Sequence, residues 1–291
     1  MEKRADIYTR VTAKIVADLE RGVRPWIKPW NAEHAAGTIT RPSRANGQPY
    51  NGINVLMLWS EASLKGYVCP IWMTYKQADD LGAHVRKGEH GSAVVYADRI
   101  KRTEAASNGD EIESEIPFLK SYTVFNCEQI EGLPQHFYAP APLPASKPER
   151  IAHADALVSA TGASIVYGGS RACYVSSTDN VHMPCIDFFG DTESYYATLL
   201  HELTHWTRHE TRLNREFGRK RWGDAGYATE ELVAELGAAF LCADLGITPE
   251  VRDDHAAYIA TWLEVLRHDK RAIFTAAAHA QRAVDYLSES P

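Results

Sequence analysis

The sequence predicts an α+β protein made of two domains. Three observations support this: segments of helical periodicity are interspersed with short segments of alternating polarity, a proline-rich stretch divides the 291 residues, and the two parts differ in charge. Residues 1–103 hold 16 Lys and Arg against 10 Asp and Glu, a balance of +6, whereas residues 147–291 hold 14 against 21, a balance of −7. A basic first part on a chain of net charge −7 indicates that this part contacts a polyanion.

The first domain is predicted over residues 1–135. Ile7, Val11, Ile15 and Leu19 recur at every fourth position and predict a helix over residues 6–21, which Gly22 ends. The other elements expected here are a helix from about Gly52 to Lys65, a helix capped at Thr74, a strand over residues 92–100, a polar hairpin tip or loop over residues 103–115, and a returning strand over residues 120–127.

A linker is predicted over residues 136–148, because five prolines lie between Pro134 and Pro148 and keep the backbone extended. The second domain is predicted over residues 149–291. Its expected elements are a helix over about 148–161, strands near 164–167, 172–176 and 181–184, a helix within 194–213, a helix over 229–245, and helices near 258–266 and 271–287.

The composition indicates in which cellular compartment the protein is expected. The longest apolar runs are far too short to span a bilayer, and the N-terminus lacks the apolar core of a signal peptide. Five cysteines form an odd, scattered set without a C-x-x-C pair, which predicts reduced thiols and argues against a disulfide framework or a zinc finger. We therefore expect a cytoplasmic protein without a membrane partner.

The motif His201-Glu202-Leu203-Thr204-His205 is the strongest functional signal. No Gly or Pro interrupts residues 194–213, so the motif is expected on a helix, where positions i and i+4 share a face. His201 and His205 would then supply two ligands of a tetrahedral metal site, with Glu202 able to reach a water at the metal. Two helical histidines can also be ordinary surface residues, so the site needs a third ligand.

Glu231 and Glu235 are the candidates for that ligand. They lie four residues apart on an apolar helix, so both carboxylates face the same way. The spacing resembles the E-x-x-A-D/N/E arrangement of gluzincin-type metallopeptidases, in which the first acid binds the metal. We therefore assign Glu231 as ligand and Glu235 as an acceptor for a ligand imidazole, although the reverse assignment is also compatible with the sequence.

One divalent metal ion per chain is expected, with zinc first and manganese as the alternative. Glu202 is expected to take a proton from water and deliver it to a leaving amine, which makes peptide hydrolysis the hypothesis.

Aromatic and basic residues are interleaved between residues 24 and 90, on loops bent by Gly and Pro. Single-stranded DNA is bound by stacking its bases on aromatic rings and by cations that follow its phosphates. Trp59 and Trp72 are expected in the core. The predicted DNA-binding residues are Trp26, Trp30, Arg41, Arg44, Lys76, Arg86 and Lys87. No module that reads base sequence is recognisable, so binding is expected to be largely sequence-independent.

Taken together, the two halves resemble the ArdC family of plasmid-encoded antirestriction proteins. The resemblance depends on Arg24–Trp30, the segments that begin at Tyr50, Trp72 and Val85, and the stretches around His201 and Glu231. It implies an N-terminal single-stranded-DNA-binding domain joined to a C-terminal zincin-like metallopeptidase domain, in a protein that protects incoming plasmid DNA from host restriction.

Two hypotheses remain open at this point. In the first, the protein is an enzyme that cuts a protein of the host restriction machinery acting on the incoming strand. In the second, it shields DNA without catalysis, and its metal site is structural or vestigial. The presence of Glu202 favours the first, because a purely structural metal site does not need it.

Overall fold

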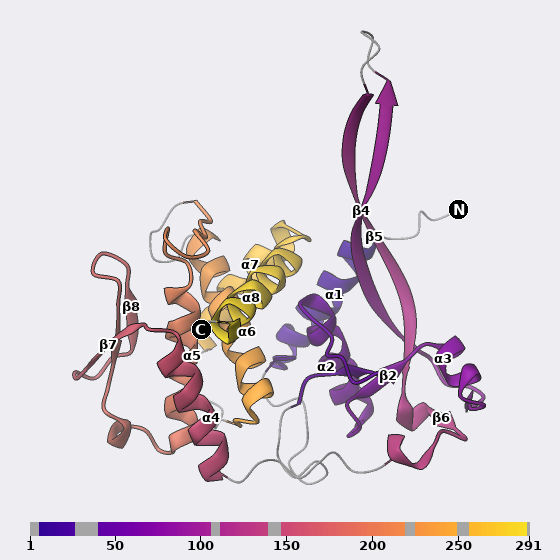
Figure 1. Ribbon diagram of the computed structural model, residues 1–291, viewed down its shortest axis with the longest axis horizontal. Coiled ribbons are helices and arrows are strands. Elements are labelled where there is room, and N and C mark those ends of the chain that lie inside the picture. Colours follow the sequence, from indigo (N-terminus) through magenta and orange to yellow (C-terminus); the bar gives the residue numbers. More distant parts are fainter. Residues whose placement is uncertain are drawn as a thin grey trace.

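The computed structural model describes residues 6–26, 40–105, 111–138, 147–218, 225–248 and 256–289. In Figure 1 an N-terminal half with a four-stranded sheet stands beside a C-terminal half of helices with a small sheet at its outer edge. This combination confirms the predicted α+β class. Within the described part of the chain, no helix combines the length and the apolar character needed to cross a membrane.

The N-terminal half follows the local signals of its sequence closely. The Asp6 carboxylate accepts a hydrogen bond from the Thr9 N–H at 2.9 Å and begins the first helix, and Gly66, with φ of 73°, ends the second. The elements are α1 (Ile7–Glu20), β1 (Ser43–Arg44), α2 (Ile53–Lys65), β2 (Ile71–Met73), α3 (Tyr75–Asp80), β3 (His84–Val85), β4 (Ser92–Ala105), β5 (Glu111–Asn126), η1 (Cys127–Gln129), β6 (Ile130–Glu131) and η2 (Gln135–Phe137). The strand order is β1-β2-β5-β4, with β3 and β6 as a separate pair.

Strands β4 and β5 form a long antiparallel hairpin that projects from the body of the protein as an arm (Figure 1). Their register extends from Ser92↔Val124 to Ala105↔Glu111, so of the two alternatives for residues 103–115 the structure has the hairpin. Its strands extend further than predicted, since residues 103–105 and 111–115 are paired, and residues 106–110 lie outside the described part. Near the body, the Asn54 side chain accepts from the Val95 N–H at 2.7 Å and donates to the Val95 carbonyl at 2.8 Å. This contact covers the outer edge of β4 and blocks pairing with another strand there.

The C-terminal half places its sheet against the helix that carries the histidine motif. Its elements are α4 (Lys147–Ala160), β7 (Ser164–Tyr167), β8 (Cys173–Val175), β9 (Asn180–Met183), η3 (Ile186–Phe188), α5 (Thr192–Trp206), α6 (Ala225–Leu245), α7 (Ala256–His268) and α8 (Ala272–Glu289). The strand order is β7-β9-β8, and β8 and β9 form the hairpin that the sequence predicts. The predicted helix within 194–213 ends earlier, because Thr207 begins a series of turns.

The two halves share one hydrophobic core. The rings of Trp26 and Trp262 pack edge to face with centroids 5.8 Å apart, and Trp59 lies 5.9 Å from Phe240. Helices α7 and α8 contact α1 and α2, respectively. The protein therefore packs as a single body across the expected linker, because the last two helices bury apolar surface of the first half.

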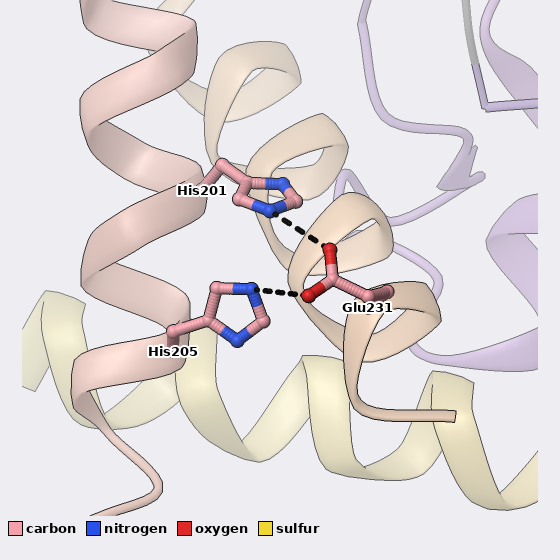
Figure 2. A group of neighbouring side chains, drawn as sticks. All are labelled: His201, His205 and Glu231. Carbon is pink, nitrogen blue, oxygen red and sulfur yellow. Dashed lines mark ion pairs between the residues drawn. The ribbon is translucent and has the colours of Figure 1, made fainter. Parts of the chain in front are cut away.

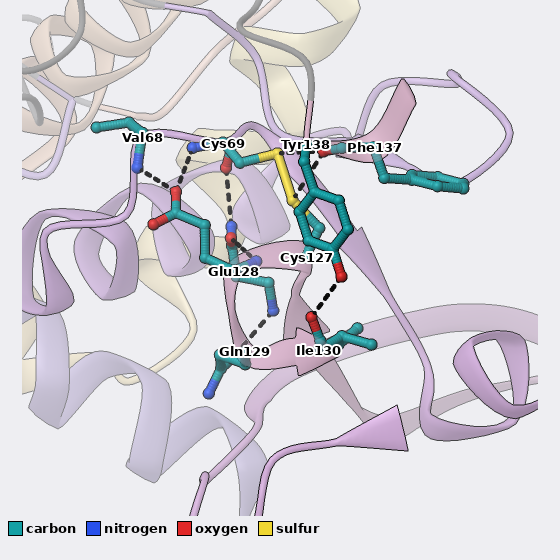
Figure 3. The surroundings of a disulfide bond; sticks show 9 residues. Val68, Cys69, Cys127, Glu128, Gln129, Ile130, Phe137 and Tyr138 are labelled. Atoms are coloured by element: carbon teal, nitrogen blue, oxygen red, sulfur yellow. Dashed lines mark hydrogen bonds between the residues drawn. A yellow bond between two sulfur atoms is a disulfide. The ribbon is translucent and has the colours of Figure 1, made fainter. Parts of the chain in front are cut away.

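A smaller core cluster lies beside β2 and β5 and contains a disulfide between Cys69 and Cys127 (Figure 3). The two cysteines are 58 residues apart in sequence, and the pairing of Trp72 with Asn126 brings their segments together. The Glu128 carboxylate also accepts hydrogen bonds from the backbone N–H groups of Val68 and Cys69 at 2.7 Å each. The prediction of reduced thiols is wrong for this pair, because cysteine spacing carries no information about strand pairing.

Candidate metal centre

Helix α5 presents the histidine motif on one face. The helix begins at Asp191, whose carboxylate accepts from the Ser194 N–H at 2.9 Å, and it buries Leu199, Leu200 and Leu203. His201 and His205 follow one another along the helix, and their ring centroids are 4.9 Å apart (Figure 2). One face of α5 therefore buries leucines while another holds two imidazoles.

Glu231 of α6 reaches across to both imidazoles (Figure 2). Its Oε2 lies 3.7 Å from His201 Nε2, and its Oε1 lies 3.5 Å from His205 Nε2. Each of the three residues offers a ligand atom, and these atoms lie within 4.8 Å of one another. Burial raises the pKa of the Glu231 carboxyl, but the hydrogen bonds and charges of His201 and His205 outweigh it and hold the pKa well below its usual range.

Two imidazole nitrogens and a carboxylate oxygen are a donor set that suits zinc, and imidazole and carboxylate are also ligands of manganese. The convergence of three such groups in a half-buried position is costly without a cation between them. The residues present therefore fit a divalent metal ion.

Glu235 lies one helical turn further along α6, on the other side of His201. Its Oε2 is 3.7 Å from His201 Nδ1. Of the two acids that the sequence offered, Glu231 thus faces the Nε2 atoms of both histidines, and Glu235 faces the opposite nitrogen of one.

Glu230 and Arg215 complete the surroundings of His205, and sequence reasoning assigned a role to neither. His205 Nδ1 donates to Glu230 Oε1 at 3.1 Å. Arg215, almost fully buried, donates to both oxygens of Glu230 at 2.8 Å. It also donates to the Thr204 carbonyl at 2.9 Å and to the Thr207 hydroxyl at 3.1 Å.

These contacts shift the pKa values of His205 and Glu230. Burial opposes a charge on His205, but hydrogen bonds to Glu230 and Glu231 and their charges prevail and raise the pKa of the imidazole to about 10. Burial likewise opposes a charge on Glu230, but Arg215 and His205 lower its pKa to about 2. The sequence held one signal of this arrangement, a third acid directly before Glu231, where the helical turn directs it toward His205.

Helices α5 and α6 approach closely enough for these contacts because α6 carries Gly237. A Cβ at this position would lie 2.6 Å from Thr204 Cγ2, well inside van der Waals contact. Thr204 is fully buried, and its hydroxyl is bonded to the Leu200 carbonyl at 2.8 Å, so it has little freedom to move. Gly237 therefore sets the distance between the histidine helix and the acidic helix.

Glu202 points from α5 toward the small sheet. It is buried, and its Oε2 accepts a hydrogen bond from the Tyr174 N–H of β8 at 2.8 Å. Because β8 is at the end of the strand order β7-β9-β8, Glu202 lies between the histidines and a sheet edge.

Two of the predicted DNA-binding residues belong to the core. Trp26 is 1% exposed and packs on Trp262, so neither face of its ring is available for a base. The Arg41 side chain is 7% exposed; its Nε lies 2.8 Å from Asp244 Oδ1, its Nη1 donates to Gln281 at 2.9 Å, and its guanidinium lies over Phe240. The structure contradicts a DNA-binding role for both, because the last helices of the chain cover these side chains.

The other predicted DNA-binding residues differ in their surroundings. Arg44 is half-buried, with its guanidinium 4.9 Å from the Tyr50 ring centroid. Lys76 is exposed and paired with Asp80, Arg86 is exposed and paired with Glu89, and Lys87 is exposed. Trp30 lies outside the described residues. Arg44 lies on β1, Lys76 on α3, and Arg86 and Lys87 directly after β3.

Comparison with known proteins gives a consistent result for both halves. Residues 5–125 match the model of the N-terminal domain of anti-restriction factor ArdC, and residues 152–279 match the model of a zincin-like metallopeptidase. The metal-free crystal structure of antirestriction ArdC protein from plasmid R388 is similar with a TM-score of 0.82 and 46% identity, over 98% of both chains. The Mn(II)-bound structure of the same protein gives 0.80 and 44% over the same shares.

Two relatives extend this comparison. Uncharacterized protein y4eC of Sinorhizobium fredii is 44% identical over 288 residues, which is 97% of this chain and 91% of that protein. DNA primase TraC of Escherichia coli is 36% identical over 305 residues, which is 98% of this chain but 27% of the primase. The region of similarity is thus a whole protein in one case and a fraction of a larger one in the other.

Proposed function

The chain belongs to the ArdC antirestriction family, and from that premise we propose that it binds single-stranded DNA with its first half and holds a metal-dependent peptidase-type site in its second. The proposed division assigns residues 1–135 to DNA, 136–148 to a linker and 149–291 to the metallopeptidase-like part. We place its action in the cytoplasm, where it would meet incoming plasmid DNA.

We assign His201, His205 and Glu231 as the metal ligands. The single observation that carries this assignment is the convergence of their three ligand atoms within 4.8 Å. Zinc is the ion expected of a zincin-like domain, and manganese is present in a structure of a relative. When bound, the ion would polarise a substrate carbonyl and lower the pKa of water.

The remaining residues have distinct roles in this proposal. Glu202 acts as general base, since one of its oxygens is bound to the Tyr174 N–H and the other can take a proton. Glu230 orients the imidazole of His205 by accepting from its Nδ1, and Arg215 holds Glu230 in place. Glu235, 3.7 Å from His201 Nδ1, is the acid placed to orient the other imidazole.

The DNA partner is supported by the basic balance of the first third of the chain, by the match to the ArdC N-terminal domain and by similarity to part of a DNA primase. Binding by charge and stacking makes the interaction largely independent of sequence. The protein substrate in this proposal is a component of the host restriction machinery.

The test is Glu202→Gln, which keeps an oxygen for the Tyr174 N–H but cannot accept a proton. We expect about one metal ion per chain to be retained, and cleavage of a labelled general protein substrate such as casein to fall by about 10²- to 10⁴-fold. Loss of the metal, or unchanged cleavage, contradicts the role given to Glu202.

A restriction-protection assay on the same variant separates the enzyme from a DNA-shielding protein. Protection that disappears with Glu202→Gln supports catalysis as the means of protection. Protection that persists, while variants deficient in DNA binding lose it, supports shielding.

A further inference from the structure

The burial of Trp26 and Arg41 leaves them no face for DNA, so within the described residues of the first half a stacking surface has to use other aromatic residues. Four tyrosines in this half are more than a third exposed: Tyr75, Tyr96, Tyr122 and Tyr138. Tyr138 uses its hydroxyl to contact the backbone of Leu133 and Ile130. Tyr96 and Tyr122 are the pair that lies on adjacent strands, β4 and β5.

The register of the arm places Tyr96 and Tyr122 on the same face of the hairpin. Tyr96 is opposite Lys120, and Tyr122 is opposite Val94, two residues further along each strand. Because side chains alternate between faces, all four share one face, and the two tyrosines are diagonal neighbours about 7–8 Å apart. Val94 is fully buried, whereas Tyr96 is 51% and Tyr122 36% exposed. The two tyrosines therefore lie at the base of the arm, where this face changes from buried to exposed.

Tyr122 is also close to the body of the protein. It interacts electrostatically with Tyr50, which is buried and whose ring centroid lies 4.9 Å from the Arg44 guanidinium. Burial is the main cause that raises the pKa of Tyr50, and the interaction with Tyr122 adds to it, so the phenol stays protonated. Lys120 thus places one cation directly across from Tyr96, and Arg44 places a second over Tyr50, with which Tyr122 interacts.

We propose that Tyr96, Lys120, Tyr122 and Arg44, here called the hairpin-base patch, form the stacking site for single-stranded DNA. Two bases stack on the tyrosine rings, while Lys120 and Arg44 contact the phosphates that flank them. Paired bases in a duplex offer no free faces, so the patch selects single strands. The proposal rests on the DNA partner proposed above and names the residues that hold it.

Arg44 was among the DNA-binding residues predicted from sequence, but the two tyrosines and Lys120 were not. Tyr96 is more than twenty residues away from Lys120 and Tyr122 in sequence, and the register of the two strands brings them together.

The experiment measures binding of fluorescently labelled oligo-dT to the full chain by anisotropy over a series of salt concentrations. We expect Tyr96→Ala to weaken binding at least fivefold at constant salt slope, and Tyr96→Phe and Tyr96→Trp to retain most of the affinity, because stacking needs a ring rather than a hydroxyl. Lys120→Ala is expected to reduce the slope of log affinity against log salt by about 0.7, the value for one phosphate contact on a single strand. Tyr167→Ala is the matched control, an equally exposed tyrosine on β7 of the other half.

Photocrosslinking provides a measurement that needs no substitution. Oligonucleotides containing 5-bromodeoxyuridine are irradiated with the unaltered protein, and the crosslinked peptides are identified by mass spectrometry. Crosslinks within residues 92–97 or 119–124 support the hairpin-base patch.

The outcomes separate this proposal from the broader one. If the unaltered chain binds oligo-dT but Tyr96→Ala binds equally well and the crosslinks map elsewhere, the patch is wrong and the DNA partner stands. If the unaltered chain does not bind oligo-dT at any salt concentration, the proposed DNA function fails, and the patch with it.

Discussion

The metal centre and the hairpin-base patch differ in where their polar side chains lie: those of the metal centre are buried or half-buried, and most of those of the patch are exposed. Around His201 and His205 the acids are buried or half-buried, and Glu230 makes three hydrogen bonds to two partners, His205 and Arg215. In the patch, Tyr96 and Lys120 are exposed, and their register on the arm defines the surface. Buried charges are expensive to leave unpaired, whereas exposed ones are replaced at little cost. Substitutions should therefore alter stability at the metal centre, and mainly DNA affinity at Tyr96 and Lys120 of the patch.

The largest effect is expected for Arg215→Ala, which leaves the buried Glu230 without its guanidinium partner. Breaking a buried ion pair by removing one member costs about 3–5 kcal/mol of unfolding free energy. Because Glu230 orients His205, metal affinity should also fall by about 10- to 100-fold. Urea unfolding and metal titration measure the two effects.

Arg208→Ala is the control for this substitution, since it removes the same kind of side chain seven residues earlier on the same segment. It is expected to change stability by less than about 0.5 kcal/mol. If both substitutions lower the unfolding free energy equally, the contacts between Arg215 and Glu230 do not account for the effect of Arg215→Ala.

Acid should weaken the same network in a defined pH range. The pKa of Glu230 is lowered to about 2 in the folded protein from an ordinary value of 4.5. A lowered carboxyl pKa stabilises the fold above the unfolded value, and this contribution is lost as pH falls through the folded one. The stability difference between the unaltered protein and Arg215→Ala should therefore narrow between pH 4.5 and pH 2, as measured by unfolding at several pH values. A gap that stays constant would show that Glu230 is not the titrating group.

The next largest effect is expected for Arg41→Ala, which tests whether Arg41 stabilises the fold or contacts DNA. Loss of its contacts with Asp244, Gln281 and Phe240 should lower the unfolding free energy by about 1.5–3 kcal/mol. Because the side chain is buried between the two halves, the salt slope of DNA binding should stay the same. If Arg41→Ala instead reduces the slope of log DNA affinity against log salt as Lys120→Ala does, then Arg41 contacts DNA and this interpretation is wrong.

Gly237→Ala should have the smallest net effect. The added Cβ meets Thr204 at 2.6 Å, which costs about 1–3 kcal/mol, while the better helix propensity of Ala returns about 1 kcal/mol. In a Thr204→Ala background the clash is relieved, so the same substitution should become neutral or stabilising. Gly190→Ala, where the Cβ meets nothing within 4 Å, is the control. Additive effects of the two substitutions in a double-mutant cycle would exclude this contact as the cause.

The metal centre was largely predictable because its information is local. A spacing of four residues on a helix places His201 beside His205 and Glu231 beside Glu235, whatever the rest of the fold does. The distances between the two helices then fit Glu231 as the acid nearest both Nε2 atoms. Arg215 was not predictable, because it enters from an irregular segment after α5 whose path has no periodicity.

The surface proposed for DNA was poorly predictable for the opposite reason. Interleaved aromatic and basic residues describe a composition, and the same composition suits an interface between two halves of a protein. Trp26 and Arg41 lie in such an interface, covered by α6, α7 and α8 from the far end of the chain.

The sequence by itself determined where most helices lie, the α+β class, the histidine motif and the acids that can complete it, because these depend on contacts within a few residues. The tertiary structure decided which aromatic and basic side chains reach solvent, how Glu230 is held, how Cys69 meets Cys127, and how the two halves share a core. Those features depend on segments that meet from distant parts of the chain, and the packing that brings them together has no pattern within either segment alone.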